Sequence, residues 1–233
     1  VHALLVFPLF VHHQAHVLFA VDDCCWHSDL NGWQRLCVWG CLDFSALSQS
    51  SRNDYWRGQF ACLVLDFFAG WLCHFVEHQI PLFWRFHIIH HADNNVDVTT
   101  GLRHHPLESV WRGLFFYMGI FVSGAPMYAV LLYQTILVFI TGFTHANINL
   151  PAWLDKSISW ILVSPNMHKV HHHWTQPYTD SNYGAVFSIW DRLLGTFMKL
   201  DPSKLKYGLD QYYPNVKDED FVALMKRPFQ KLK

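Results

Sequence analysis

Residues 74–91 read HFVEHQIPLFWRFHIIHH, and this stretch decides how the chain folds. Its first two histidines, His74 and His78, are four positions apart, and its last three stand at positions i, i+3 and i+4. Side chains at those spacings lie on one face of an α-helix. The pair Ile80-Pro81 in the middle ends one helix and allows the next to begin. The stretch therefore predicts two consecutive helices that each present histidines on one face.

Histidines recur in the same pattern further along the chain. Twelve of the 17 histidines lie within residues 74–173, and the last cluster, His168-x2-His171-His172, repeats the spacing of the cluster at 87–91. Neutral imidazoles gathered on adjacent helices form a metal site, and so many of them predict two metal ions. Imidazole suits zinc, copper, iron and nickel, whereas a structural zinc site takes four ligands and often uses cysteine. No cysteine joins the clusters, which favours two iron ions.

The composition is that of a membrane protein. Hydrophobic residues make up 52% of the 233 residues and charged residues only 15%, whereas a soluble domain carries roughly 25% charged residues. The mean hydropathy is only +0.10, so part of the chain must lie outside the bilayer. A formal net charge of −1 gives no reason to expect a nucleic acid partner. The six cysteines include no CxxC pair, so we expect reduced, buried thiols.

Four stretches are apolar enough to lie in a bilayer. Residues 59–78 form the clearest span, because twenty helical residues rise about 30 Å, the thickness of the hydrocarbon core. Residues 109–123 and 127–146 meet at residues 124–126 (GAP), which predicts a tight turn between the two helices of a hairpin. Residues 33–47 form a shorter, interrupted candidate. The expected fold is an all-α integral membrane protein with about four transmembrane helices.

The remaining residues are expected outside the membrane. Residues 151–233 are mostly polar, apart from a short apolar run at 158–163 that suits an interfacial helix. The basic excess of the tail favours the cytoplasmic side, so we expect a cytoplasmic helical cap that holds the histidine-rich di-metal site. The chain then divides into amino-terminal membrane or interfacial helices and a loop (1–58), a histidine-bearing domain (59–198) and a cytosolic tail (199–233).

On these motifs the chain resembles the fatty acid hydroxylase/sterol desaturase superfamily, whose members carry histidine boxes in this order. The resemblance covers more than half of the chain and looks closest to the compact bacterial members. The stretches that carry it are His74-x3-His78, LFWRFHIIHHADNNVDVTTGLRHHPLE (82–108), THANINLP (144–151), SPNMHKVHHHW (164–174) and TDSNYGAVFSIWDRLLGT (179–196).

The resemblance implies a multi-pass membrane enzyme that uses two iron ions (Fe2+/Fe3+) and O2 to oxidise C–H bonds of a lipid, such as a sterol or a fatty acyl chain. Hydroxylation and desaturation are both compatible with the ligand set. The membrane would be a bacterial inner membrane or one of the endoplasmic reticulum type, with the metal site on the cytoplasmic side. Because the chain has no Gly-rich dinucleotide fingerprint, electrons would come from a partner, by resemblance a cytochrome b5-like or ferredoxin-type protein.

Ten histidines match the ligand positions of the superfamily. The implied ligands are His74, His78, His87, His90, His91, His105, His145, His168, His171 and His172. Two further histidines, His104 and His173, stand where the superfamily usually has another residue. We expect both to lie behind the ligands or at the surface.

Four polar residues are candidates for supporting the ligands. Asn147 follows the predicted ligand His145 by two positions. It is a candidate for a weak metal ligand or for a hydrogen-bond partner of a ligand histidine. The alternative is an ordinary polar residue at the C-terminal end of a helix. Asp180, Asn182 and Asp191 are candidates for accepting a hydrogen bond from the second ring nitrogen of a ligand histidine. For Asp180 and Asn182, turn formation is an equally good explanation.

Three residues in the first histidine box depart from the superfamily pattern. Phe75 stands where arginine usually follows the first histidine, Trp71 stands where tyrosine is frequent, and Glu77 sits inside the box but is expected to point away from the ligand. These departures keep a second hypothesis open, in which the chain is a non-catalytic membrane subunit with a structural metal site. Metal transport is a third reading, disfavoured because the boxes lie at helix ends.

Overall fold

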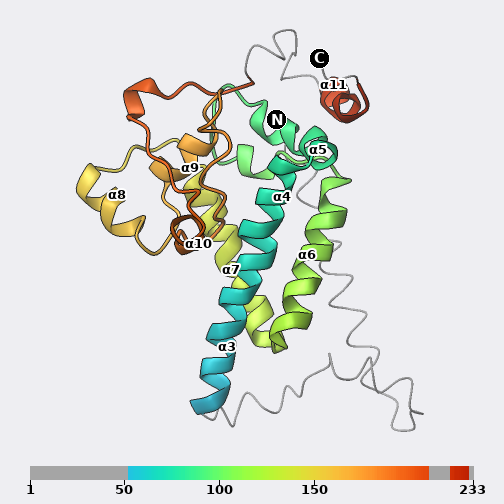
Figure 1. Ribbon diagram of the computed structural model, residues 1–233, viewed down its shortest axis with the longest axis vertical. Coiled ribbons are helices and arrows are strands. Elements are labelled where there is room, and N and C mark those ends of the chain that lie inside the picture. Colours follow the sequence, from blue (N-terminus) through green and yellow to red (C-terminus); the bar gives the residue numbers. More distant parts are fainter. Residues whose placement is uncertain (1–51, 210–220, 231–233) are drawn as a thin grey trace.

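The computed structural model describes residues 52–209 and 221–230, and within these ranges the chain is helical, with a single isolated β-bridge between Leu162 and Phe187. The expected membrane segment at 33–47 lies outside the described residues. The described part consists of three long apolar helices with a set of short helices gathered around their upper ends (Figure 1).

The longest helix carries the first histidine box. It is built from α3 (Arg52–Leu65), the π-helical segment η4 (Asp66–Leu72) and α4 (Cys73–Gln79). Its 25 residues Tyr55–Gln79 are long and apolar enough to cross a membrane. The loop expected at the end of residues 1–58 was wrong from Arg52 onward, because the segment 52–58 (RNDYWRG) continues the apolar helix that follows it.

The break predicted at Ile80-Pro81 is present. Ile80 adopts an extended conformation (φ −102°, ψ 116°), and α5 (Pro81–His91) starts with proline at its first turn, where the missing N–H costs nothing. The chain therefore turns sharply between the two histidine-bearing helices, α4 and α5, so that they can face each other.

The predicted hairpin is also present. It consists of α6 (Glu108–Ser123) and α7 (Met127–Thr144), joined through Gly124 in the left-handed conformation at φ +59°, which glycine adopts without strain. Both helices pack against α3. Their outer faces are apolar and exposed, as at Phe121 (89%) and Phe139 (74%). Of these two helices only α7 is long and apolar enough to be a candidate span, so the described residues contain two candidates for the about four expected spans.

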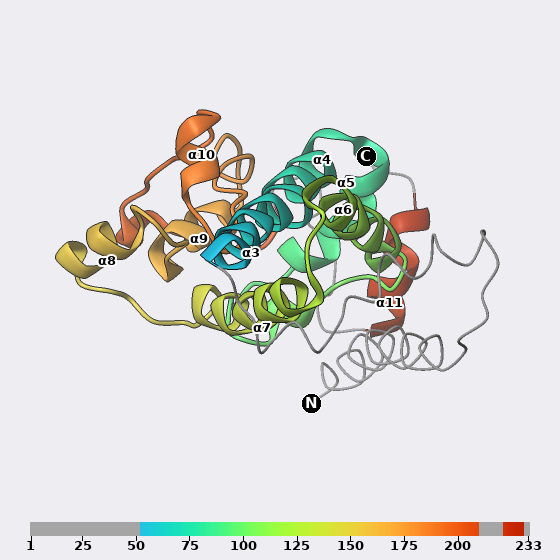
Figure 2. The same cartoon turned by 90° about the horizontal axis from the view of Figure 1, so that it is seen from below.

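Short helices form the upper part of the molecule. Along the chain they are η5 (Thr100–Leu102), α8 (Ala152–Ile158), α9 (Pro165–His171), α10 (Ile189–Leu193), η6 (Pro202–Lys204), α11 (Phe221–Lys226) and η7 (Arg227–Phe229). Helices α8, α9 and α10 lie on one side of the long helix and α11 lies on the other (Figures 1 and 2). The tail is not wholly solvated as expected, because Leu224 joins a small core with Ile88, Ile89 and Ala92 of the α5 region.

A buried carboxylate ties the upper part to the long helix. Asp66 accepts hydrogen bonds from the backbone N–H groups of Val186 and Phe187 (both 3.0 Å) and from the indole of Trp190 (3.0 Å). The hydroxyl of Tyr133 on α7 donates to it at 3.3 Å. Since a buried charge is tolerated only when it is well hydrogen-bonded, this residue holds the loop before α10 against the middle of the long helix.

Candidate metal centre

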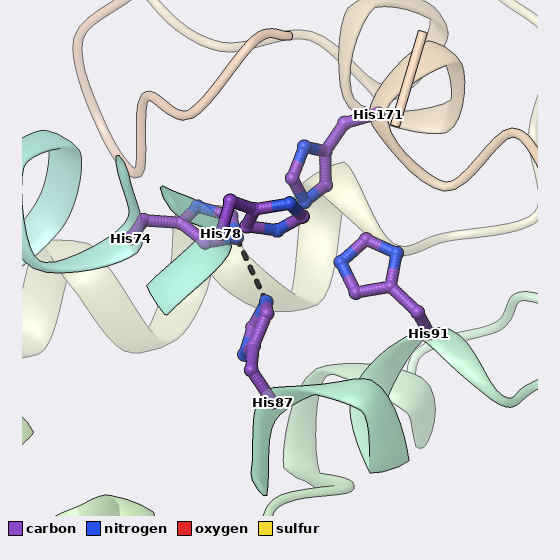
Figure 3. Close-up of side chains that lie close together, drawn as sticks. All are labelled: His74, His78, His87, His91 and His171. Carbon is purple, nitrogen blue, oxygen red and sulfur yellow. Dashed lines mark hydrogen bonds between the residues drawn. The ribbon is translucent and has the colours of Figure 1, made fainter. Parts of the chain in front are cut away.

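Five histidines from three helices converge at the upper end of the long helix, and we call them group 1. They come from α4, α5 and α9, and their ring nitrogens all lie within 4.8 Å of one another: His74, His78, His87, His91 and His171. Figure 3 shows the five rings pointing toward a common centre, with His74 and His87 joined through their Nε2 atoms at 3.1 Å. All five are buried or nearly so.

Four further histidines form a second cluster beside the first, which we call group 2. It contains His90, His145, His168 and His172. The Nε2 atom of His145 lies 3.0 Å from that of His168 and 3.3 Å from those of His90 and His172. The rings of the two groups touch, since the centroids of His91 in group 1 and His172 in group 2 are 4.7 Å apart.

The local sequence explains how neighbouring histidines reach different groups. A helix turns by about 100° per residue, so adjacent side chains point to different centres. On α5, His90 enters group 2 and His91 enters group 1, while α9 ends with His171 in group 1, followed by His172 in group 2. The start of α9 is set by Ser164, whose hydroxyl accepts a hydrogen bond from the third residue of the helix at 3.1 Å.

Backbone carbonyls determine which ring nitrogen carries the proton. The Nδ1 atoms of His74 and His171 lie 2.9 and 2.7 Å from carbonyl oxygens of the 181–183 loop. In group 2, His90 and His145 likewise donate from Nδ1 to carbonyl oxygens at 3.0 and 2.9 Å. A neutral imidazole that donates from Nδ1 has only a lone pair at Nε2. In these four rings the Nε2 atom that faces the group is therefore an acceptor without a proton.

This arrangement fits metal ions. The lone pairs of His90 and His145 face each other at 3.3 Å, which is repulsive unless a cation lies between them. In group 1 the buried Nε2 atoms of His78, His91 and His171 have no hydrogen-bond partner. Since buried polar atoms are nearly always paired, the donor set is complete only with a metal at each centre. Imidazole nitrogens alone, without thiolate, suit iron, zinc or copper.

Burial keeps the histidines in the form that binds metal. Desolvation lowers the pKa of His87 to about 3 and that of His145 to about 4. Burial, reinforced by neighbouring imidazoles, also lowers the pKa well below its usual value for His90, His91, His168, His171 and His172. Metal ligation requires neutral imidazole, so the site is prepared for metal at neutral pH.

A buried charge network lies behind His87, and sequence reasoning missed most of it. Glu108 accepts a hydrogen bond from Nδ1 of His87 at 2.9 Å and another from Nδ1 of His104 at 2.8 Å. Arg112 donates to Glu108 at 2.8 Å and to Glu77 at 2.6 Å. The signal in the sequence was the spacing of four between Glu108 and Arg112, which places both on one face of α6, with His104 just before the helix.

His87, His104 and Glu108 could in principle hold a third cation. The guanidinium of Arg112 already supplies positive charge to Glu108, 2.8 Å away. We therefore interpret this trio as the support of group 1 rather than as a metal site of its own.

The structure brings together nine of the ten implied ligands and leaves out His105. The Nδ1 atom of His105 accepts a hydrogen bond from the backbone N–H of Leu107 at 3.1 Å, and its ring packs against Phe86 and Phe229. Its neighbour His104 lies closer to the groups, stacked on a ring of group 2 at 4.7 Å. The turn after η5 thus directs the first of the two histidines inward and the second outward.

Of the two candidate carboxylates, one lies at hydrogen-bond distance from a ligand histidine and the other supports the loop behind the ligands instead. Asp180 accepts from Nδ1 of His78 at 3.2 Å. Asp191 touches no histidine; it accepts from the backbone N–H of Tyr183 at 2.8 Å, and the carbonyl of the same tyrosine accepts from His74. The loop that orients group 1 is therefore itself held by a buried carboxylate.

Three other candidates lie away from the two groups. Asn147 is exposed at the surface. The ring of His173 accepts a hydrogen bond from the backbone N–H of Lys206 at 3.1 Å. Asn182 binds the backbone of Met198 through both its amide nitrogen (2.9 Å) and its oxygen (2.9 Å). Its positive φ of 52° is one that asparagine tolerates, so its role here is to shape the loop.

The two aromatic departures in the first box line the region beside His74. Trp71 and Phe75 stack at 5.0 Å with an interplanar angle of 10°, and Phe75 meets the ring of Tyr183 edge-on at 5.4 Å. The indole of Trp71 donates to Asp191 at 3.1 Å. Both residues thus pack against the loop that orients His74, and neither removes a nitrogen from group 1.

Comparison with known proteins gives one family and several relatives. The family described as "Fatty acid hydroxylase" matches residues 59–196, more than half of the chain. Alkylglycerol monooxygenase from Xenopus tropicalis is 30% identical over 154 residues, which cover 66% of this chain and 33% of the relative. Ornithine lipid hydroxylase OlsE from Rhizobium tropici is 27% identical over 170 residues, covering 72% of this chain and 49% of the relative.

A sterol-modifying protein is a more distant relative. Cholesterol 25-hydroxylase from Homo sapiens is 24% identical over 140 residues, covering 58% of this chain and 49% of the relative. In each case the match spans no more than about half of the relative's length. No solved structure matches the chain.

Proposed function

Because this chain belongs to the fatty acid hydroxylase family, we propose that it is a membrane-bound, O2-dependent lipid hydroxylase that works with two iron ions. The observation that carries the proposal is the convergence of nine buried, neutral imidazoles into two touching groups. Six of the rings have an acceptor for a proton on Nδ1, and three Nε2 atoms have no hydrogen-bond partner. Iron, when bound in both groups, would supply the reductive activation of O2 that oxygen insertion into an unactivated C–H bond requires.

The metal ions would be divided between the two groups. Group 1 would hold one iron ion through up to five Nε2 atoms, and group 2 would hold the other through four. Helices α4, α5 and α9 contribute to the pair of groups from different directions, while His145 enters directly after α7. Ligands delivered by packed helices are positioned more accurately than ligands on loops.

The surrounding residues would orient the ligands and keep water away. Asp180, Glu108 and the backbone carbonyls of the 181–183 loop accept the Nδ1 protons, which makes each ring a better donor toward the metal. Burial of the rings keeps bulk water from the reacting centre, where it would divert oxidising equivalents.

We propose a membrane lipid as the substrate class. The matched relatives are named for an alkylglycerol, an ornithine lipid and cholesterol, three chemically different lipids with long apolar portions. The two apolar helices Tyr55–Gln79 and Met127–Thr144 would place the histidine groups at the surface of a bilayer, within reach of such a lipid. Electrons would come from a cytochrome b5-like or ferredoxin-type partner, with hydroxylation favoured over desaturation by the names of the relatives.

An oxygen-labelling assay tests the proposal. Purified chain loaded with iron without O2 is given a chemical reductant, isotopically labelled O2 and fractionated membrane lipids, and products are read by mass spectrometry. We expect a lipid product that carries one labelled oxygen atom, and its loss in the His90→Ala/His171→Ala double variant. His173→Ala serves as the matched control, because this histidine lies outside both groups.

One set of results would favour the non-catalytic subunit instead. Stable zinc in both groups, no O2 consumption after iron loading and tight co-purification with a larger complex would together contradict the hydroxylase.

A further inference from the structure

Six large apolar side chains are exposed on the segments that pack beside the long helix, outside the hairpin itself. They belong to α8, to the segment that follows it and to the region of α10, and we call them the α8–α10 patch: Trp153 (70% exposed), Leu193 (68%), Ile161 (66%), Trp160 (59%), Leu194 (49%) and Ile189 (43%). An exposed group of this size on a soluble surface usually marks an interaction site. No described helix lies in front of α8 or α10 when the molecule is seen from below (Figure 2).

The height of the patch follows from the hydrogen bonds of Asp66. This residue accepts from the N–H groups of Val186 and Phe187 and from Trp190, so the chain entering α10 is held at its level. Gln79, at the top of the long helix, lies thirteen residues further on, about 20 Å at 1.5 Å per residue. The chain around α10 therefore lies well below the upper end of the long helix. If the long helix crosses a bilayer, this part of the chain lies at the depth of the bilayer and not in the water above it.

The polar neighbours of the patch suit a bilayer surface. The guanidinium of Arg192 lies 4.5 Å from the ring centroid of Trp160 and 3.9 Å from that of Phe197. Lys156 is exposed three positions after Trp153, on the same face of α8. Tryptophan with arginine or lysine is the combination that gathers where acyl chains meet headgroups, because aromatic bodies enter the apolar layer while charges contact phosphate.

We propose that the α8–α10 patch is a membrane-embedded flank, seated in the headgroup and upper acyl region of the leaflet that the top of the long helix crosses. The occupant of the patch is the bilayer itself, because Leu162 and Phe187, which border the patch, pack directly against the core that α3 and α7 share. The inference rests on the proposed function, in which these helices span a membrane. This flank sets the height and tilt of the two histidine groups over the leaflet that supplies the lipid.

Photo-crosslinking tests the proposal directly. A photoreactive amino acid replaces Leu193 or Trp153 in the full chain, which is reconstituted in nanodiscs of phosphatidylcholine and phosphatidylglycerol carrying an alkyne on the acyl chain. Phe139, exposed on α7, serves as the lipid-facing reference. Lys204, exposed on η6, serves as the aqueous control. We expect lipid adducts at 193, 153 and 139 and none above background at 204.

Other occupants give other adducts. Peptide mapping that finds residues 193 and 153 joined to residues 1–51 of the same chain, or to a second copy, would overturn the proposal. Adduct yields as low as at 204 would also overturn it, since they would place the patch in water.

The readout separates this inference from the proposed function, because crosslinking requires neither iron nor turnover. Lipid adducts at position 193 in a protein that binds no metal would support the membrane-embedded flank and contradict the proposed hydroxylase. A protein with two irons and labelled lipid product, but no adducts at 193 or 153, would show the reverse. A Trp153→Ser/Leu193→Ser variant should keep its iron, because both side chains are exposed and distant from the ligands, but should release more readily from nanodiscs into mild detergent.

Discussion

The two histidine groups lie side by side but are held in different ways. In group 1, the carboxylates of Asp180 and Glu108 accept hydrogen bonds from two ligand histidines, and backbone carbonyls accept from two others. In group 2, the acceptors seen for two of the four rings are the backbone carbonyls of Thr100 and Thr141. A carboxylate behind an imidazole increases its donor strength, whereas a carbonyl fixes its orientation without adding charge. Group 1 should therefore depend on buried side-chain charge, and group 2 on the helix ends.

Two adjacent histidines belong to different groups, so a substitution at either one should empty one group and leave the other filled. These substitutions should have the largest effect. His171→Ala should remove the metal of group 1 and leave about one ion per chain, and His172→Ala should do the same for group 2, because each removes a direct ligand. Both variants should lose hydroxylation entirely. Metal content per chain, combined with a spectroscopic probe of the remaining ion, distinguishes them. If the two spectra were identical, the division into two centres would be wrong.

Removing a supporting carboxylate should have a smaller and one-sided effect. Glu108→Ala takes the acceptor from His87 and leaves Arg112 and Glu77 to reorganise. Loss of such a partner typically weakens metal binding about 10–100-fold, and we expect that loss for group 1 alone. Competition with a chelator measures it, ion by ion. The matched control is Glu108→Gln, which keeps an acceptor oxygen but not the charge, and equal weakening of both groups would contradict the comparison.

Lowering the pH should protonate the buried histidines of both groups and so destabilise the metal-free protein. This effect depends on burial, which the two groups share, and not on the acceptors behind the rings, which differ. Unfolded histidine has a pKa of about 6.5, whereas His87 and His145 have folded values of about 3 and about 4. Below pH of about 6.5 the unfolded chain therefore binds more protons than the folded chain, so the stability of the metal-free protein falls as the pH falls. Thermal unfolding in detergent at several pH values should show a lower midpoint in acid. A midpoint that is unchanged or rises would contradict the burial of these rings.

The smallest effect is expected at His105, where the superfamily pattern and the geometry disagree. The ring packs against Phe86 and is bonded to a backbone N–H outside both groups. His105→Ala should therefore retain both metal ions, while His104→Ala should weaken group 1 through Glu108. Elemental analysis of the two variants decides the matter, and loss of one ion from His105→Ala would restore this residue to the ligand set.

Much of the site could be predicted from local patterns. The spacing of three and four residues placed the histidines on helical faces, and Ile80-Pro81 and Gly124 marked the turns that occur. The division into two groups follows from helical rotation, but it required knowing which helices meet. Periodicity also could not separate His104 from His105, since their directions depend on a turn after η5.

The residues that sequence reasoning missed act through tertiary contacts. Asp66 and Glu77 are the two acidic residues of the predicted span 59–78, and each is bonded to a segment distant in sequence, residues 186–190 and Arg112 respectively. The packing of the short helices α11 and η7 on α5 could not be predicted for the same reason. The tail is mostly polar, and isolated apolar residues such as Leu224 form no pattern that indicates a contact. Local propensity does not report such pairings.

Metal content per chain is the measurement that tests the central claim most directly. The protein is purified in mild detergent without added metal, and iron, zinc and copper are determined against protein concentration by elemental analysis. The account predicts about two iron ions per chain, falling to none in His90→Ala/His171→Ala. Zinc in both positions that anaerobic iron reconstitution can replace would still agree with it. A chain that holds no metal before or after reconstitution would contradict the account.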